Sequence, residues 1–303
     1  MFTGCGTALI TPFQRDQSLD EAALRRLVRR QIDAGIDFLV PCGTTGESPT
    51  LTHAEHLRVV EITVEEAKAG PRTVPVLAGA GGYNTAEVIA LATEVKQLGA
   101  DGILSVTPYY NKPTQEGLFQ HYAAISKAVG SLPIVIYSVQ GRTGVNVEPS
   151  TLKRLTAFDN IVAVKEASGS ITQIGAVLQQ MPERFNVLSG DDALTLPLIS
   201  LGGHGLISVA SNEIPAEMTR LVALARQGDF AGARAIHRKY LPLMDINFIE
   251  ANPIPVKTAM ALMGLCEPVW RLPMVPPSAE NQSKIAHLLG ELSMLPVRSA
   301  HAD

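Results

Sequence analysis

The stretch IVAVKEASG (161–169) places a lysine directly after a strongly apolar run. The four residues before Lys165 are apolar and mostly β-branched, which predicts a strand buried on both faces, as in a parallel sheet. Lysine is rarely buried, and removal of its ammonium group from water lowers its pKa toward neutrality. A neutral lysine is a nucleophile that condenses with a carbonyl group to give a Schiff base. The alternative is a structural lysine, but the adjacent Glu166 would point to the other face of a strand and is a poor partner.

Further polar residues follow other apolar runs. GTTGES (43–48) offers hydroxyls and backbone N–H groups that suit a carboxylate or phosphate, although short Gly/Thr turns are common. Arg142, in GRTG, can hold a carboxylate through two parallel hydrogen bonds, whereas most loop arginines are simply solvated. Tyr137 is either an ordinary buried aromatic or a proton relay beside Lys165. Histidines do not recur at these positions, so we expect no metal site.

The elements that must position these groups are short apolar runs that alternate with longer amphipathic ones. Eight runs are predicted as strands: 6–11, 36–41, 73–79, 101–107, 132–138, 161–166, 185–190 and 205–210. Ser18 and Glu21 predict a capping box at the first helix. Eight strand–helix pairs predict an α/β protein with a (β/α)8 TIM barrel, whose catalytic residues lie at the carboxyl ends of the strands. An open doubly wound sheet is the alternative, but TPFQRDQ follows the first strand in place of a Gly-rich turn.

The end of the chain and its composition complete the predicted organisation. From Glu213 onward the pattern is helical, so we expect a barrel catalytic domain over 1–228 and a C-terminal helical extension over 229–303. The net charge of −4, without a basic stripe, argues against a nucleic-acid partner. The uncharged run 193–212 contains Pro197 and several glycines, which predicts a short strand between two loops and no membrane span. Three scattered cysteines and the absence of a basic N-terminal region favour a cytoplasmic protein.

These motifs together resemble the dihydrodipicolinate synthase / N-acetylneuraminate lyase family over residues 1 to about 290. The matching motifs are GTTGES, TPYYNKPTQEGL, Tyr137 with GRTG, VKEASG, LSGDD, GGHGLISV and NPIPVK. GTTGES, TPYYN and the arginine in GRTG resemble the synthase branch. The resemblance implies a lyase without cofactor or metal that condenses pyruvate with L-aspartate 4-semialdehyde to 4-hydroxy-tetrahydrodipicolinate in lysine biosynthesis. Two alternatives stay open: a pyruvate aldolase acting on a sugar-acid aldehyde, and a non-catalytic paralogue that binds pyruvate or lysine.

The resemblance also implies catalytic roles. Lys165 would form the Schiff base with pyruvate, and Tyr137, hydrogen-bonded to Thr44, would move protons during imine and carbon–carbon bond formation. Tyr110 would complete this relay from a neighbouring subunit, which requires a homo-oligomer; we expect a homotetramer built as a dimer of dimers. A Thr–Tyr–Tyr chain moves protons without placing a fixed charge beside the amine, where a carboxylate would raise the lysine pKa.

Substrate-binding roles follow in the same way. Thr45 would hold the pyruvate carboxylate, Arg142 would bind the carboxylate of the second substrate, and Gly190 and Ile207 would line the site through backbone groups. One departure lies beside the arginine: the family usually has Tyr-Asn-Val-Pro where this chain has YSVQ (137–140). Loss of the proline frees the backbone before Arg142, which bears on the second substrate more than on the Schiff-base step.

Some members of the family bind L-lysine at a subunit interface. The residues that match that allosteric site are Ser48, His53, His56, Glu87 and Tyr109. Pro49 and Tyr83 depart from it, the latter where an asparagine commonly contacts the ligand. By spacing alone, the two histidines of HAEH are one helical turn apart and typical of a solvated helix face, not of the zinc arrangement H-E-x-x-H.

Overall fold

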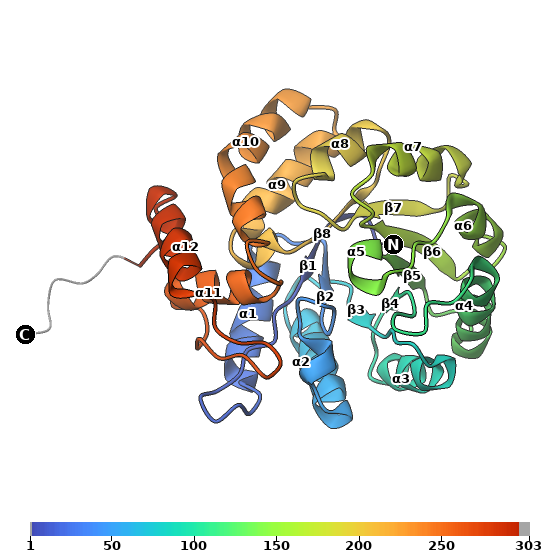
Figure 1. Cartoon of the computed structure of the whole chain (residues 1–303), viewed down its shortest axis with the longest axis horizontal. Helices are drawn as coiled ribbons and strands as arrows, with labels where there is room; N and C mark the ends of the chain where they lie inside the picture. Colours follow the sequence, from blue (N-terminus) through green and yellow to red (C-terminus); the bar gives the residue numbers. More distant parts are fainter. Residues whose placement is uncertain (1, 297–303) are drawn as a thin grey trace, which may run out of the picture.

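The computed structural model describes residues 2–296, which form a barrel of parallel strands surrounded by helices (Figure 1). The strands are β1 (Gly4–Ala8), β2 (Phe38–Val40), β3 (Leu77–Gly79), β4 (Gly102–Val106), β5 (Ile134–Ser138), β6 (Ile161–Glu166), β7 (Asn186–Ser189) and β8 (Gly205–Ser208). Each overlaps a run that the sequence predicts as a strand.

The strands pair in the order β2-β1-β8-β7-β6-β5-β4-β3, and every pair is parallel. A bridge from Leu39 to Val76 joins β2 to the segment that leads into β3 and closes the ring. The predicted (β/α)8 barrel is therefore confirmed, and the open doubly wound sheet is wrong.

Helices follow the strands around the outside of the barrel. The outer helices are α1 (Glu21–Asp33), α2 (His53–Ala69), α3 (Thr85–Gln97), α4 (Gln115–Val129), α6 (Pro149–Leu155), α7 (Ile171–Gln180), α8 (Thr195–Ser200) and α9 (Pro215–Arg226). Single turns lie in the loops: η1 (Ser48–Thr50), α5 (Gln140–Thr143) and η2 (Ala210–Asn212). The chain continues as α10 (Phe230–Ile246), α11 (Ile254–Leu262) and α12 (Ala279–Glu291) on one side of the barrel (Figure 1).

The predicted capping box at Ser18 is wrong. Helix α1 begins at Glu21, and the side chain of Asp20 caps it by accepting a hydrogen bond from the backbone N–H of Ala23 at 2.8 Å. The Ser18 hydroxyl instead donates to Asp16 in the preceding turn, at 2.6 Å. Aspartate and serine are comparable N-caps, so the residue next to the helix takes the position.

Three apolar clusters hold the fold together. The largest fills the space between strands and outer helices. A second lies inside the barrel, where side chains such as Phe38, Leu104 and Leu188 pack with Tyr137. A third joins α11 to the barrel through Val256 and Met260. Because inward-facing side chains fill the interior, the barrel is a packed core, and chemistry is confined to its rim.

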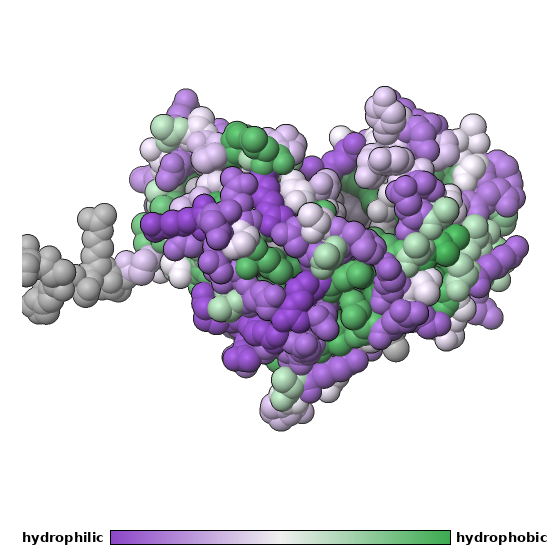
Figure 2. Space-filling model, turned by 90° about the horizontal axis from the view of Figure 1, so that it is seen from below, coloured by the Kyte–Doolittle hydropathy of each residue, from purple (hydrophilic) through white to green (hydrophobic). Residues whose placement is uncertain are grey.

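The uncharged run 193–212 departs in part from its prediction. It contains the expected strand β8, but the segment before the strand forms helix α8 in place of a loop. Within residues 2–296, no helix is long and apolar enough to cross a membrane. Hydrophilic residues cover most of the face seen in Figure 2, with hydrophobic groups near its middle.

The predicted boundary between residues 228 and 229 falls in the turn between α9 and α10. Helix α10 packs on α9 and on α8, and α11 packs on α12 and on η2 beyond the last strand. Division of the chain into a barrel and an extension therefore stays a prediction, because the two parts share their packing.

Candidate active site

Lys165 lies inside the carboxyl end of the barrel. It pairs in register with Tyr137 on β5 and Leu188 on β7, and only 5% of the residue is exposed. Its Nζ atom is 4.3 Å from the centroid of the Tyr137 ring. Glu166 faces away from the barrel and accepts a hydrogen bond from Gln173 at 2.8 Å. The expectation that Glu166 is not the partner of Lys165 is thereby confirmed.

Burial lowers the pKa of Lys165 to about 8. The buried Asp192 carboxylate raises this pKa by a smaller amount, and the Arg142 guanidinium lowers it. Asp192 is held by the Ser208 hydroxyl at 2.5 Å and by backbone N–H groups of the turn after β8. Roughly one tenth of Lys165 is then neutral at pH 7, against a negligible fraction for an exposed lysine. The amine is a competent nucleophile near physiological pH.

Tyr137 lies beside this amine, and Thr44 lines the same cavity as Tyr137. Burial raises the pKa of Tyr137, and this effect outweighs the Arg142 charge and a hydrogen bond with Thr44, which both lower it. The two residues line one cavity of about 250 Å³ with Leu104 and Val106. Tyr137 therefore keeps its proton at neutral pH and is equipped to pass it to a substrate oxygen.

The GTTGES loop is held by contacts from distant parts of the chain. Cys42 and Glu47 have φ angles of 56° and 53°, in the left-handed region that non-glycine residues rarely adopt. The Thr11 hydroxyl donates to the Gly46 carbonyl at 2.6 Å, and Lys257 pairs with Glu47 at 2.5 Å with both side chains buried. A strained backbone of this kind persists only where its surroundings fix it. The sequence did not predict the contacts that Thr11 and Lys257 make with this loop.

Thr45 and Arg142 share one neighbour, Asn252. The Thr45 hydroxyl oxygen accepts a hydrogen bond from Nδ2 of Asn252 at 3.0 Å. The Arg142 guanidinium, on the exposed side of α5, donates through Nη2 to the backbone carbonyl of Asn252 at 3.2 Å. The two residues expected to bind the two substrate carboxylates are thus linked through a residue that the sequence did not single out.

The altered YSVQ segment leaves the direction of Tyr137 unchanged. Ser138 points to the opposite face of β5, where its hydroxyl donates to Asn146 at 3.2 Å and accepts from the backbone N–H of Val147 at 3.1 Å. Gln140 begins the single turn α5 that carries Arg142. The prediction that Ser138 points away from Tyr137 is confirmed, and its hydroxyl makes hydrogen bonds with polar groups of the loop that follows.

Gly190 follows β7 and Ile207 lies on β8, and their expected role of lining the site through backbone groups stays a prediction. The backbone N–H of Gly190 donates to the Glu166 carbonyl at 2.7 Å. A Cβ atom at Gly190 would lie 3.1 Å from Cε of Lys165 and 2.7 Å from Cβ of Ala167, so the glycine leaves room for the lysine side chain. Ile207 on β8 is fully buried in the cluster inside the barrel.

Tyr110 is not brought to Lys165 within one chain. It follows β4 with a φ angle of 37° and is 89% exposed. The residue before it, Tyr109, lines the cavity that holds Thr44 and Tyr137, whereas Tyr110 does not. The expected relay is therefore incomplete in the isolated chain.

The five residues of the expected lysine site surround two adjoining cavities. Ser48, His53, His56 and Tyr109 line the cavity shared with Tyr137, while His53, Tyr109 and Glu87 line a neighbouring one of about 400 Å³. Tyr83 packs edge-on against Tyr109, with ring centroids 5.2 Å apart.

The prediction of a solvated face is correct for one histidine of HAEH and wrong for the other. His53 is exposed and lies 2.8 Å from Glu94. His56 is buried, its Nε2 lies 2.8 Å from the Gly79 carbonyl, and burial lowers its pKa. Helix α2 packs this turn against the barrel, which the spacing of the two histidines does not reveal.

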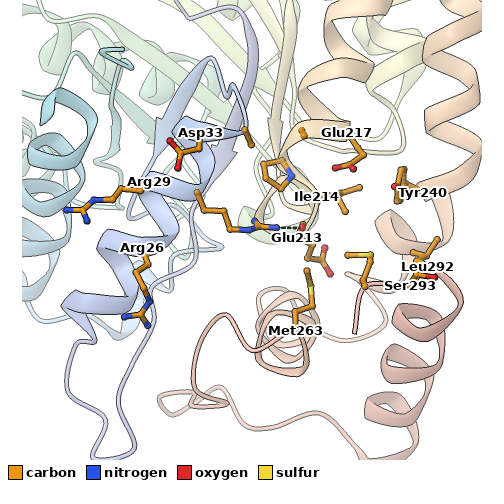
Figure 3. A pocket seen from close by; sticks show the side chains of 15 residues that line it. Arg26, Arg29, Asp33, Glu213, Ile214, Glu217, Tyr240, Met263, Leu292 and Ser293 are labelled. Atoms are coloured by element: carbon orange, nitrogen blue, oxygen red, sulfur yellow. Dashed lines mark hydrogen bonds between the residues drawn. The ribbon is translucent and has the colours of Figure 1, made fainter. Parts of the chain in front are cut away.

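A larger cavity of about 790 Å³ lies away from these groups, between α1, the start of α9 and the end of α12 (Figure 3). Figure 3 shows Arg26, Glu213 and Tyr240 around it, and no predicted site residue lines it. Burial raises the pKa of Glu213 to about 8. Cavity size alone would therefore have pointed away from the place where Lys165, Tyr137 and Thr44 converge.

Comparison with known proteins agrees with this geometry. The sequence model of the Dihydrodipicolinate synthetase family matches residues 1–292. A curated relative from Koribacter versatilis, named 4-hydroxy-tetrahydrodipicolinate synthase, is 54% identical over 293 residues, which are 96% of each chain. The crystal structure of dihydrodipicolinate synthase from Aquifex aeolicus matches with a TM-score of 0.94 and 44% identity, over 98% of this chain and 100% of that one. The enzyme from Acinetobacter baumannii, complexed with pyruvate, matches with a TM-score of 0.94 and 39% identity, over 97% of this chain and 100% of that one. The chain therefore belongs to the dihydrodipicolinate synthetase family.

Proposed function

We propose that the protein is a Schiff-base lyase that condenses pyruvate with L-aspartate 4-semialdehyde to give 4-hydroxy-tetrahydrodipicolinate, a step of lysine biosynthesis. The observation that carries the proposal is the buried amine of Lys165, with a pKa of about 8, beside the protonated Tyr137. Relatives whose sequences are about half identical to this chain carry the name of this enzyme. They favour this reaction over a sugar-acid aldolase or a non-catalytic paralogue.

The chemistry follows from the groups at the barrel rim. The neutral Lys165 amine adds to the keto carbon of pyruvate, and the resulting carbinolamine loses water as Tyr137 protonates its hydroxyl. The protonated imine withdraws electrons, so the methyl group loses a proton and becomes an enamine carbon. That carbon attacks the aldehyde, and the new alkoxide takes back from the relay the proton that the methyl group gave up. The amino group of the aldehyde substrate then attacks the imine carbon, which closes the ring as a cyclic imine and releases the Lys165 amine. Thr45 holds the pyruvate carboxylate and Arg142 the carboxylate of the aldehyde.

Borohydride reduction tests this function directly. The protein is reduced in the presence of pyruvate, its peptides are mapped by mass, and turnover with L-aspartate 4-semialdehyde is assayed in parallel. We expect a stable adduct on Lys165, no adduct in Lys165→Ala, and turnover of the wild type. An adduct without turnover would move the search to other aldehydes, and no adduct would make Lys165 structural.

The rate of imine formation is expected to depend on pH through Lys165. Only the neutral amine attacks, so the rate constant should rise with pH, pass its midpoint near pH 8 and then level off. Quenched-flow trapping at saturating pyruvate measures it. Because the Asp192 carboxylate raises the lysine pKa, Asp192→Asn should move the midpoint to lower pH. A flat profile between pH 6 and 9 would contradict the proposed nucleophile.

We further propose a homotetramer, a dimer of dimers, in which Tyr110 enters the site of a neighbouring subunit. The support is its 89% exposure beside a site that lacks it, together with the half-exposed Tyr83 nearby. Size-exclusion chromatography with light scattering measures the number of subunits in the assembly. A cytoplasmic location of the protein also stays a prediction.

Mixing two inactive variants tests the shared site. Lys165→Ala and Tyr110→Phe damage different sites if Tyr110 crosses the interface, so dissociation and reassociation of the mixture should restore roughly a quarter of the wild-type activity. Lys165→Ala mixed with Tyr137→Phe is the matched control and should restore none, because both residues act within their own chain. Equal outcomes for the two mixtures would rule out the shared site.

We also propose that L-lysine regulates the enzyme. The support is one cavity that is lined both by residues of the expected lysine site and by residues of the proton relay; these are Ser48, His56 and Tyr109, and Thr44 and Tyr137. A ligand bound there would act on the proton relay through direct contact. Tyr83, where the family commonly has an asparagine, is the departure that bears on its affinity. Calorimetric titration with L-lysine tests this prediction, and absence of binding at millimolar concentration would overturn it.

A further inference from the structure

Asn252 connects the two expected carboxylate-binding residues of the site. It precedes α11, in the C-terminal part of the chain, and is 4% exposed. Its side-chain amide reaches Thr45, 207 residues earlier in the sequence, and its backbone carbonyl accepts from Arg142, 110 residues earlier. Among residues 2–296, the bond from Asn252 is the sole hydrogen bond to the Thr45 side chain.

We propose that Asn252 is a positioning residue that aims the Thr45 hydroxyl at the carboxylate of pyruvate and holds the Arg142 guanidinium for the carboxylate of the aldehyde. The inference rests on the proposed function. A hydroxyl group has one proton and two acceptor positions. When the oxygen of Thr45 accepts from Asn252, its proton is left to donate elsewhere, and a carboxylate is a strong acceptor.

The direction of this hydrogen bond decides its effect. With Nδ2 toward Thr45, Asn252 is the donor and leaves the hydroxyl proton for the substrate. With the amide reversed, Oδ1 would take that proton and Thr45 would present only lone pairs to an anionic carboxylate. An aspartate at position 252 has the same shape and can only accept once ionised, so it imposes the unfavourable direction.

The surrounding loop gives this contact its importance. The backbone is in the left-handed region at Cys42 and Glu47, on both sides of Thr45. Thr11 and Lys257 anchor the loop at Gly46 and at Glu47. These anchors hold the loop, but neither makes a hydrogen bond to the Thr45 side chain, which is bonded to Asn252. The C-terminal part of the chain thus supplies one anchor for the loop and one for its binding hydroxyl.

Steady-state kinetics of Asn252→Ala and Asn252→Asp test the proposal, with borohydride trapping as a second readout. We expect Asn252→Ala to raise KM for pyruvate about tenfold, the effect of one oriented hydrogen bond to a charged group. Asn252→Asp should raise it further, because the carboxylate takes the Thr45 proton and repels pyruvate. At saturating pyruvate both variants should still form the adduct on Lys165, so the loss should appear in KM before kcat.

Two comparisons separate positioning from a structural role. Asn247→Ala is the matched control, since Asn247 is as buried and lies in the same part of the chain, but its amide donates to Glu213 at 2.6 Å, away from the site. It should lower thermal stability and leave KM unchanged. In a Thr45→Val background, Asn252→Ala should change KM for pyruvate less than twofold, because the hydroxyl it aims is gone.

An unchanged KM in Asn252→Ala would overturn the proposal, as would a tenfold effect that persists in Thr45→Val. An Asn252→Asp variant that binds pyruvate as well as the wild type would overturn the assigned direction of the hydrogen bond. Failure of the wild type to form any pyruvate adduct would instead remove the proposed function, so the two failures are distinguishable.

Discussion

Replacement of Lys165 by methionine is expected to abolish imine formation and, at the same time, to raise the free energy of unfolding at pH 7. Lys165 is 5% exposed, and its amine lies beside the Tyr137 ring of the apolar barrel interior, where its charged form is poorly solvated. Methionine has a similar length, carries no charge and packs well in irregular apolar space. The residue proposed to perform the chemistry is therefore also expected to destabilise the fold.

The pH range of this gain follows from the two pKa values of Lys165. The folded pKa is about 8 and the ordinary value is 10.5, so the unfolded chain binds more protons between these pH values. The stability of the wild type consequently rises with pH from about 8 to about 10.5. Below that range the full cost is present, about 3 kcal/mol, and above it the cost vanishes. The advantage of Lys165→Met should be largest at pH 7 and fade as the pH approaches 10.5.

Borohydride trapping and urea unfolding at fixed protein concentration measure the two effects. Lys257→Met is the matched control, because Lys257 is also buried but pairs with Glu47. Its replacement leaves the Glu47 carboxylate buried without a partner, which should cost about 3–5 kcal/mol. Lys165→Met and Lys257→Met should thus change stability in opposite directions. Residual trapping in Lys165→Met, or lower stability at pH 7, would contradict the assignment of Lys165 as an unpaired nucleophile.

Elements of the fold were predictable because their signals are local. Dense β-branched residues before Lys165 are enough to indicate a buried strand, and alternation of such runs with amphipathic segments indicates the barrel. Gly190 was expected from the family resemblance, and its lack of a Cβ leaves room for the lysine side chain. Where two local signals compete, prediction fails: Asp20 displaces Ser18 as the cap of α1.

Contacts between distant segments could not be read from the sequence. The NPIPVK motif contains both Asn252 and Lys257, but nothing in it shows that these side chains reach Thr45 and Glu47 more than 200 residues away. His56 was misjudged because its burial depends on the barrel beneath α2 and not on the spacing within the helix. Tyr110 is a different case, since a single chain leaves it on the surface and its expected partner belongs to another subunit.

Tyr137→Phe is expected to separate proton transfer from nucleophilic attack. The phenylalanine ring keeps the packing of the barrel interior and the contact with Nζ of Lys165, 4.3 Å from the ring centroid in the wild type. The variant loses the hydroxyl group and its hydrogen bond with Thr44. Burial is the main cause of the lowered pKa of Lys165, and the phenylalanine ring keeps that burial, so the fraction of neutral amine should hardly change. Slow trapping with pyruvate should remain.

Turnover of Tyr137→Phe should fall by about 10²–10⁴-fold, the usual contribution of a positioned acid–base group. Tyr122→Phe is the control, because Tyr122 is fully buried in α4 and its hydroxyl donates to the Ser105 carbonyl at 3.1 Å, outside the relay. The Tyr122→Phe control should lose about 1 kcal/mol of stability and keep its turnover.

Single-turnover trapping measures imine formation in Tyr137→Phe, and steady-state assays measure its turnover. If trapping and turnover fall by the same factor in Tyr137→Phe, its hydroxyl is needed only for imine formation, and its proposed part in the later carbon–carbon bond step is wrong. If trapping persists while turnover collapses, the proton relay limits the steps after imine formation, and Lys165 needs only its own lowered pKa to attack.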